Sequence, residues 1–284
     1  MIVPTRDRPA ALGECLQALA LQTAAETLEV IVVDDGSSAA GEVVEVVARH
    51  PRARLVHASG FGPAAARNLG AAAAHGPILC FTDDDCVPRN DWAERLAEAI
   101  DAGADAAAGS TLSAGGSLAA ASELVAGAPA GGRPQGGGLL TFAPSNNLAV
   151  SKLVFDALPF DESYPDAAAE DRDWCARLAA SGCALHHVPG AVVVHRQQLT
   201  LGRFLKRQVR YGEGAYRFRS GHGGRPPRLE PAGFYLALVR RAFGQGGRVG
   251  VLVVVTQAAT AVGFVKGWAR AHGQSRRPSR FRRR

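Results

Sequence analysis

The chain has 284 residues, of which 47% are hydrophobic and 20% are charged, a composition typical of globular proteins and not of disordered or collagen-like chains. Five cysteines without a C-x-x-C pair argue against a disulfide-stapled secreted domain and against a zinc ribbon. Residues 1–202 carry 13 basic and 24 acidic side chains, a net charge of −11, whereas residues 203–284 carry 19 basic and two acidic ones, a net charge of +17. We therefore expect two regions with different partners.

Residues 1–110 alternate between strand-like and helix-like segments. The sequence predicts strands over 28–33, 54–57 and 77–81, and helices over 41–50, 63–74 and 92–100. Asp34 and Asp35 follow the first of these strands, and Asp83, Asp84 and Asp85 follow the third. The order is typical of an open, mostly parallel α/β sheet flanked by helices, which binds ligands beyond the carboxyl ends of its strands.

The middle of the chain combines a Gly- and Ala-rich loop with further α/β elements. Residues 113–138 have no sustained periodicity, so we expect a mobile loop with a helix near 118–125. A strand that runs into a helix is expected over 147–154, and a helix over 170–181 ends at Gly182. Residues 188–195 have the composition of another buried strand.

The character of the sequence changes after Thr200. Residues 203–219 are basic, 222–231 form a Gly/Pro/Arg linker, and 249–265 contain no charge. A membrane span needs about 20 apolar residues, so we expect 203–284 to be a basic helical extension at the membrane surface, with a disordered run over 276–284. A helical appendage packed on residues 1–202 is the alternative. No leader pattern opens the chain, and we expect a cytoplasmic location at the inner face of the cell membrane.

The acidic clusters are candidates for a metal site. Three adjacent carboxylates repel one another, so they are favoured beside a cation, and their hard oxygens suit Mg²⁺ or Mn²⁺. A solvated turn that caps the following helix is the alternative for either cluster taken alone. Because both clusters follow strands of one parallel sheet, we expect them at the same edge.

Four further side chains are candidates for the same site. Arg67 lies on a predicted helix from which its guanidinium could reach a diphosphate. Glu170 and Asp171 open a predicted helix, where carboxylates either cap the helix dipole or act as a general base. His195 ends a predicted strand and is either a structural histidine or a metal ligand.

The motifs together resemble family 2 glycosyltransferases, which have a GT-A fold and invert the sugar of a nucleotide-sugar donor. The matching segments are 3–9, 32–37, 62–70, 81–88 and 170–177, and 146–150 and 160–162 resemble the acceptor-side segment of the family. The resemblance covers roughly residues 1–200, and we expect residues 1–202 to form the GT-A domain.

The resemblance implies a role for each matching residue. Asp171 would be the catalytic base, and Asp83, Asp85 and His195 would hold a divalent metal, Mn²⁺ or Mg²⁺. Asn147 and Glu170 would lie on the acceptor side. The residues expected to bind the donor nucleotide are Pro4, Arg6, Arg8, Asp35, Arg67, Asp83 and Asp84. Arg6 replaces the aromatic residue often found there and could stack on the base through its guanidinium plane.

The expected reaction is transfer of a sugar from a nucleoside-diphosphate sugar to a hydroxyl acceptor, which can be lipid-linked, in the synthesis of cell-envelope glycan, polysaccharide or glycolipid. A nucleotidyltransferase acting on sugar phosphates is an alternative. Such an enzyme usually has a Gly-rich loop right after its first strand, and residues 5–9 contain no glycine. A nucleic-acid-binding protein is the non-enzymatic alternative. The basic region has no aromatic-basic RNA motif, so we expect no nucleic-acid partner.

Overall fold

The computed structural model describes residues 1–128, 138–164, 168–221 and 231–274. Within these ranges nine strands form one sheet in the order β3-β2-β1-β4-β8-β6-β9-β5, with β7 paired to β9. The strands are β1 (Ile2–Thr5), β2 (Val30–Asp35), β3 (Ala53–Ala58), β4 (Ile78–Thr82), β5 (Cys86–Pro88), β6 (Ala106–Ala114), β7 (Leu139–Leu140), β8 (Asn147–Ser151) and β9 (Leu185–Arg196). The α-helices are α1 (Pro9–Ala20), α2 (Ala40–Ala48), α3 (Pro63–Ala73), α4 (Trp92–Asp101), α5 (Ser117–Gly127), α6 (Lys152–Ala157), α7 (Glu170–Ala180), α8 (Leu201–Gly221), α9 (Ala232–Gly244) and α10 (Gly247–Gln274).

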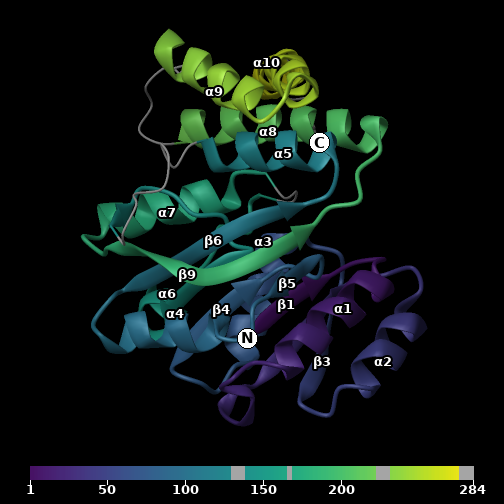
Figure 1. Cartoon of the computed structure of the whole chain (residues 1–284), viewed down its shortest axis with the longest axis vertical. Helices are drawn as coiled ribbons and strands as arrows, with labels where there is room; N and C mark the ends of the chain where they lie inside the picture. The colour runs from purple at the N-terminus through teal and green to yellow at the C-terminus, as the bar shows by residue number, and fades with distance from the viewer. Residues whose placement is uncertain (129–137, 165–167, 222–230, 275–284) are drawn as a thin grey trace, which may run out of the picture.

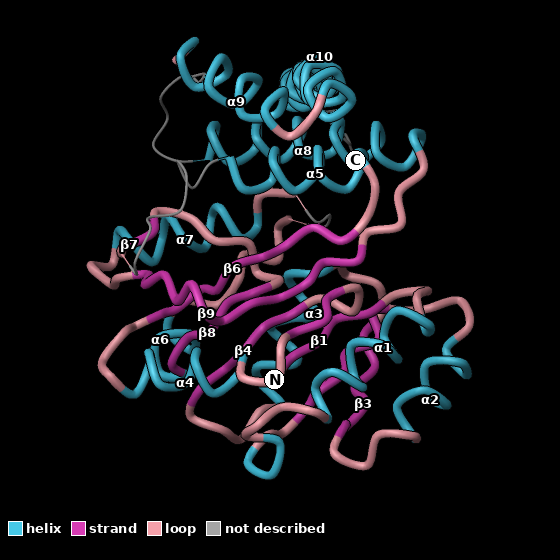
Figure 2. The backbone as a smooth tube through the Cα atoms, viewed as in Figure 1, coloured by secondary structure: helices cyan, strands magenta, loops and turns pink. Residues whose placement is uncertain are grey.

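The first four strands of the order form the parallel half of the sheet. β2 pairs in parallel with β3 and β1, and β1 pairs in parallel with β4. The carboxyl ends of β1, β2 and β4 therefore lie at one edge of the sheet. Figure 2 draws the strands of this sheet in magenta. Asp34 and Asp35 are the last residues of β2, and Asp83 follows Thr82 at the end of β4. The prediction that both acidic clusters share an edge is confirmed.

The other half of the sheet differs from the predicted, mostly parallel arrangement. β8 pairs antiparallel with both β4 and β6, and β5 pairs antiparallel with β9, whereas β6 and β9 are parallel. A parallel connection needs a crossover of a dozen or more residues. Only residues 83–85 separate β4 from β5, too few for a parallel connection between them, and β5 pairs antiparallel with β9 instead. The open α/β sheet is confirmed, with mixed strand directions.

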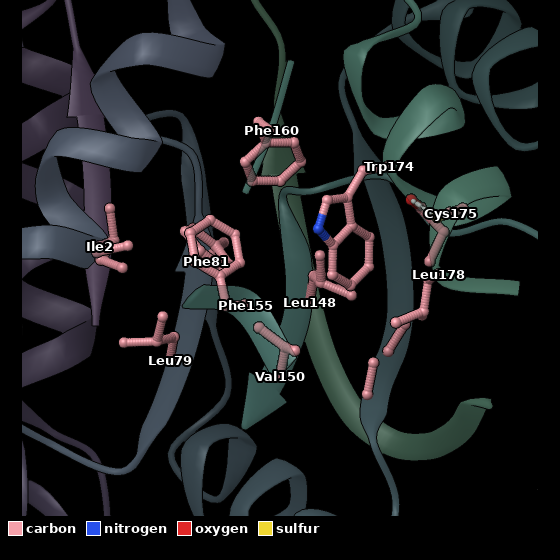
Figure 3. Packing of buried hydrophobic residues seen from close by; sticks show 14 of the residues in the cluster. Ile2, Leu79, Phe81, Leu148, Val150, Phe155, Phe160, Trp174, Cys175 and Leu178 are labelled. Atoms are coloured by element: carbon pink, nitrogen blue, oxygen red, sulfur yellow. Dashed lines mark hydrogen bonds between the residues drawn. The ribbon is translucent and has the colours of Figure 1, made fainter. Parts of the chain in front are cut away.

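Alternation along the strands builds one hydrophobic layer on each face of the sheet. Ile31 and Val33 belong to the core shared with α3, α6 and α7, and Val30 and Val32 belong to the core shared with α1, α2 and α4. Figure 3 shows the first core, in which Phe81, Phe155 and Phe160 pack together and Trp174 closes one side. These layers fix the strand ends that carry the acidic clusters.

The strand β6 and the helix α1 were not singled out by the sequence. β6 begins with three alanines and Gly109 instead of β-branched residues, and it is a strand because β8 and β9 pair with both of its edges. A Cβ on Gly109 would lie 1.8 Å from the carbonyl oxygen of Ala191, so only glycine fits there. The helix expected near 118–125 is confirmed as α5. Part of the loop expected over 113–138, residues 129–137, lies outside the described residues.

The last three described helices pack with α5 as a separate layer beside the sheet (Figure 1). Phe204, Ala242 and Val253 are buried in this layer. α8 and α10 approach closely, because a Cβ on Gly212 would lie 2.0 Å from the carbonyl oxygen of Thr260 and one on Gly263 would lie 1.9 Å from that of Val209. Small residues thus allow the two backbones to touch.

One described helix is long and apolar enough to cross a membrane by length and composition. It spans Gly247–His272 within α10, with a mean hydropathy of 1.8, and only 28% of its apolar window is buried. Several large apolar side chains on it are exposed, namely Val251, Val254, Val255, Val262, Val265 and Trp268. Most of the expected linker over 222–231 and all of the expected disordered run over 276–284 lie outside the described residues.

The contact between α8 and α10 predicts opposite effects of the same substitution at two glycines of α8. Gly212→Ala places a methyl group against the α10 backbone and should lower stability by about 1–3 kcal/mol. Gly202→Ala meets no atom within 4 Å and should leave stability unchanged or raise it by up to about 1 kcal/mol, because alanine favours the helix. Thermal unfolding followed by circular dichroism compares them, and equal melting temperatures would contradict the packing.

Candidate functional site

A cleft of about 1460 Å³ opens at the acidic edge of the sheet, between the strand ends and α8. This volume exceeds the 300–1,000 Å³ or so of a pocket for one small ligand, so it has room for two substrates. The sequence-predicted residues that line the cleft are Pro4, Arg6, Arg8, Asp35, Arg67, Asp83, Asp85 and His195. Four others, Asp84, Asn147, Glu170 and Asp171, are not among the residues that line it.

Pro4, Arg6 and Asp35 form the end of the cleft above β1 and β2. Asp35 Oδ2 accepts a hydrogen bond of 3.0 Å from the backbone N–H of Gly62, while its buried Oδ1 has no hydrogen-bond partner among the described residues. The guanidinium of Arg6 is exposed and passes over Gly60, which has a positive φ of 76°. An unpaired carboxylate oxygen beside a planar cation can bind a nucleoside through its hydroxyl groups and its base.

The three consecutive aspartates after β4 contact three different sets of partners. Asp83 accepts a hydrogen bond of 2.7 Å from Arg67. Asp84 is fully buried and accepts one of 2.7 Å from the Thr5 hydroxyl, and its other oxygen lies 2.7 Å from Arg8. Asp85 accepts a hydrogen bond of 2.7 Å from Arg8. Asp84 thus fixes the turn from within, and Asp83 and Asp85 face the cleft.

Asp84 and Asp85 have opposite pKa shifts for reasons that their surroundings explain. Burial raises the pKa of Asp84 to about 7, with the attraction of Arg8 opposing it and the repulsion of Asp85 adding to it. Burial also acts to raise the pKa of Asp85, but the hydrogen bond and charge of His195 and the charge of Arg8 outweigh it and lower the pKa to about 2. Asp85 is therefore ionised at neutral pH and can bind a cation.

His195 lies between two carboxylates. Its Nε2 is 3.2 Å from Asp85 Oδ1, and its Nδ1 is 3.0 Å from Glu123 Oε2. Burial opposes protonation of the ring, but the hydrogen bonds to Asp85 and Glu123 outweigh it and raise the pKa of His195 to about 10. A carboxylate on one ring nitrogen is the usual way to orient the other toward a metal.

Ligand atoms of Asp85, Cys86 and His195 lie within 4.8 Å of one another. Burial raises the pKa of the Cys86 thiol well above its usual range, so this sulfur stays protonated and is a poor ligand. The carboxylate remains, and the imidazole can join it once an incoming ion displaces the proton on Nε2, because a histidine ligand must lose that proton to bind a metal. Oxygen and nitrogen donors suit Mn²⁺. The donor set of this edge therefore fits a divalent ion.

Arg67 joins the aspartates to the start of α7. Its buried guanidinium pairs with Asp83 and lies 3.2 Å from Glu170, and its Nε has no hydrogen-bond partner among the described residues. Burial, together with the neighbouring Asp171, raises the pKa of Glu170 to about 7 against the attraction of Arg67. Burial also raises the pKa of Asp171, and Arg67 opposes that shift as well. The three acids therefore share one arginine.

The expected acceptor-side residue Asn147 lies away from the cleft. Its side chain is fully buried and is bonded to the indole N–H of Trp92 and to the backbone at Gly109, Ser110 and Ala191. Through these hydrogen bonds the amide oxygen and nitrogen of Asn147 join β8 to β6 and β9. Its environment is therefore that of a structural residue.

Sequence reasoning missed Glu123, Gln197 and the α8 residues of the cleft. Gln197 bonds to Glu123 and His195, and it accepts a hydrogen bond from Arg207 of α8. Glu123 lies in a Gly- and Ala-rich stretch, 72 residues from His195. The available signal for α8 was a spacing that places four cations on one helix face, namely Arg203, Lys206, Arg207 and Arg210.

The fold is that of the GT-A glycosyltransferases. It is similar to a mannosyltransferase of Pyrobaculum calidifontis solved in complex with GDP-Man and Mn²⁺, with a TM-score of 0.56 and 20% identity over 95% of this chain and 83% of that one. It is also similar to TarS residues 1–349 of S. aureus in complex with UDP, with a TM-score of 0.53 and 17% identity over 97% and 92% of the two chains.

Residues 1–123 match the model of glycosyl transferase family 2. The pre-mycofactocin glycosyltransferase of Mycobacterium tuberculosis is 29% identical over 267 residues, which are 89% of this chain and 55% of that protein. The glycosyltransferase AglE of Haloferax volcanii is 28% identical over 75% of this chain and 71% of its own length. The chain thus spans about half the length of the mycobacterial relative.

The shared arginine predicts a large and pH-dependent stability effect. Arg67→Met leaves the buried Glu170 without its cation and should lower stability by about 3–5 kcal/mol at pH 8. At pH 5 the loss should be smaller, because the folded-state pKa of Glu170 is already raised to about 7 and the carboxyl is then protonated.

Urea unfolding at the two pH values measures this effect. Arg95→Met is the control, because Arg95 forms an exposed pair with Asp91 that contributes little. A loss that is equal at both pH values, or no greater than that of the control, would contradict the pairing.

Proposed function

We propose that the protein is an inverting glycosyltransferase that moves a sugar from a nucleoside-diphosphate sugar to a hydroxyl acceptor in the synthesis of cell-envelope glycan, polysaccharide or glycolipid. The observation that carries the proposal is the meeting of Asp35, Asp83, Asp85 and His195 at one end of a two-substrate cleft. The family match of residues 1–123 and the sugar nucleotide in the mannosyltransferase complex support it.

In this proposal a divalent ion, Mn²⁺ or Mg²⁺, is held by Asp85 and His195, with Asp83 beside them. When bound, such an ion neutralises the negative charge that develops on the departing nucleoside diphosphate. The donor set at this edge and the Mn²⁺ of the mannosyltransferase complex support this assignment. Arg8 holds Asp85 in place, and Glu123 orients the ring of His195.

The protein's own residues bind the donor and move one proton. Asp35 and Arg6 bind the nucleoside, and Arg67 contributes positive charge beside its diphosphate. Asp171 is half-buried next to Arg67 of the cleft wall, and the proposal requires an acceptor that reaches past this wall to it. Asp171 then removes the acceptor's hydroxyl proton while that oxygen bonds to the anomeric carbon and the bond to the diphosphate oxygen breaks, which inverts the carbon. Burial supports the role of Asp171, because a raised pKa makes a carboxylate a stronger base. Glu170 holds Arg67 in place on the acceptor side.

Substitutions of the two α7 acids test the proposed base. Asp171→Asn should lower transfer by about 10²-fold or more, because an amide cannot accept the proton, and donor binding should persist. Glu170→Gln should have a smaller effect. Nucleoside diphosphate released from a panel of sugar nucleotides, with a membrane extract as the acceptor source, measures transfer.

Thermal shift with Mn²⁺ and a panel of nucleoside diphosphates measures donor binding in the same variants. Asp85→Ala should lose the Mn²⁺-dependent stabilisation that Asp171→Asn retains. Transfer by Asp171→Asn at the wild-type rate would place the base elsewhere, and unchanged Mn²⁺ dependence in Asp85→Ala would rule out the proposed metal site.

We also propose that residues 203–284 are an extension that holds the GT-A domain, residues 1–202, on the cytoplasmic face of an anionic membrane. The exposed apolar side chains of α10 and the net charge of +17 over this region support a helix that lies in the interface. Each basic residue near an anionic surface contributes about 1 kcal/mol. A lipid-linked acceptor would then meet the cleft at the membrane.

Vesicle flotation at low salt tests the membrane contact. The full chain should float with vesicles of phosphatidylcholine and phosphatidylglycerol, and Val255→Asp with Val262→Asp should abolish this. Val44→Asp is the control, because Val44 is equally exposed on α2 but lies outside the extension. A full chain that stays unbound, or an equal loss in the control, would contradict the proposal.

A further inference from the structure

We propose that the wall of the cleft formed by α8 and α10 binds a phosphate group carried by the acceptor. This inference rests on the proposed glycosyl transfer and adds the chemical class of the acceptor. It concerns Arg203, Lys206, Arg207 and Arg210 of α8 and Lys266 of α10, which all line the cleft.

The charges that line the cleft divide between its two walls. The wall at the strand ends carries five carboxylates and four arginines, whereas the wall from α8 and α10 carries five cations and no carboxylate. A divalent ion and the diphosphate of a donor cancel each other's formal charge at the first wall. Arg203, Lys206 and Lys266 therefore remain for the second substrate, with Arg207 and Arg210 beside them.

Few groups of the protein offset these cations. Arg207 donates to the neutral amide oxygen of Gln197. Within the described ranges, Arg203, Lys206 and Lys266 form no ion pair. Glu14 of α1, one of the carboxylates of the opposite wall, is already paired with Arg196. A cluster of cations in a concave site favours an anion with several acceptor oxygens, and a phosphate monoester carries a charge of about −1.5 to −2.

The positions of the cations define one surface. Residues 203, 206, 207 and 210 have the i, i+3, i+4, i+7 spacing that places side chains on a single helix face. Lys266 joins them because Gly263, one turn earlier on α10, lies against the α8 backbone at Val209. The surface therefore depends on the close contact of the two helices.

The surroundings of Lys266 favour a lipid-linked phosphate. Val262 lies one turn before Lys266 and is 51% exposed, and Val265 lies directly before Lys266 and is 60% exposed. An acceptor with its phosphate on the cations would have its hydrocarbon chain beside these valines and beside the proposed membrane surface. A soluble phosphate ester would use the same cations without the valines.

The experiment measures binding of three probes to the full chain saturated with Mn²⁺ and with the nucleoside diphosphate that stabilises it most. The probes are dihexanoyl phosphatidic acid, glycerol 3-phosphate and dihexanoyl glycerol, which separate the phosphate from the acyl chains. The test variant combines Lys206→Gln with Lys266→Gln. The control combines Arg240→Gln with Arg241→Gln, which removes the same charge from exposed positions of α9 outside the cleft.

We expect phosphatidic acid to bind the wild type and the control, and to bind the test variant at least tenfold more weakly, with dihexanoyl glycerol not binding. Equal binding of glycerol 3-phosphate would support the phosphate site and assign it to a soluble acceptor. Unchanged phosphatidic acid binding in the test variant would overturn the proposal. So would a loss of nucleoside diphosphate binding in that variant, because the cations would then serve the donor. If the wild type binds no nucleoside diphosphate with Mn²⁺, the proposed function fails instead.

Discussion

The site depends on how three consecutive carboxylates are held together at the end of β4. Their repulsion is offset by three basic side chains: Asp83 pairs with Arg67, Asp84 and Asp85 both pair with Arg8, and Asp85 also pairs with His195. These cations come from α3, from the turn after β1 and from β9, so the cluster forms only when the parallel half of the sheet and β9 are both in place. Removing one cation affects several elements at once.

The arrangement also separates structural from chemical roles within one short turn. Asp84 is buried and joins the turn to β1 through Thr5, while its two neighbours reach the cleft. The two adjacent acids at the start of α7 also have different partners: Glu170 pairs with Arg67, whereas Asp171 accepts hydrogen bonds from the backbone at Arg172 and Ser145. Adjacent residues in the sequence thus have different environments.

The acidic edge of the sheet could largely be predicted from the sequence, because the residues that follow the carboxyl end of each strand are visible in the local sequence. Asp34, Asp35 and the acids after β4 each follow a run of apolar residues, and parallel pairing brings such ends together. β6 could not be predicted in the same way, since its alanines are strand-forming only between β8 and β9. Asn147 matched a motif, but its hydrogen bonds to distant backbone groups make it structural. Glu123 contacts His195 through a separation of 72 residues, which no local pattern encodes.

The central claim is that Asp85 and His195 hold a divalent ion beside a nucleoside diphosphate. A crystal of the full chain grown with Mn²⁺ and the nucleoside diphosphate that stabilises it, measured at the manganese absorption edge, tests this most directly. We expect one anomalous peak within about 2–2.5 Å of an Asp85 oxygen and of His195 Nε2, with the diphosphate on its other side. A peak elsewhere, or a diphosphate bound on α8 without the ion, would contradict it.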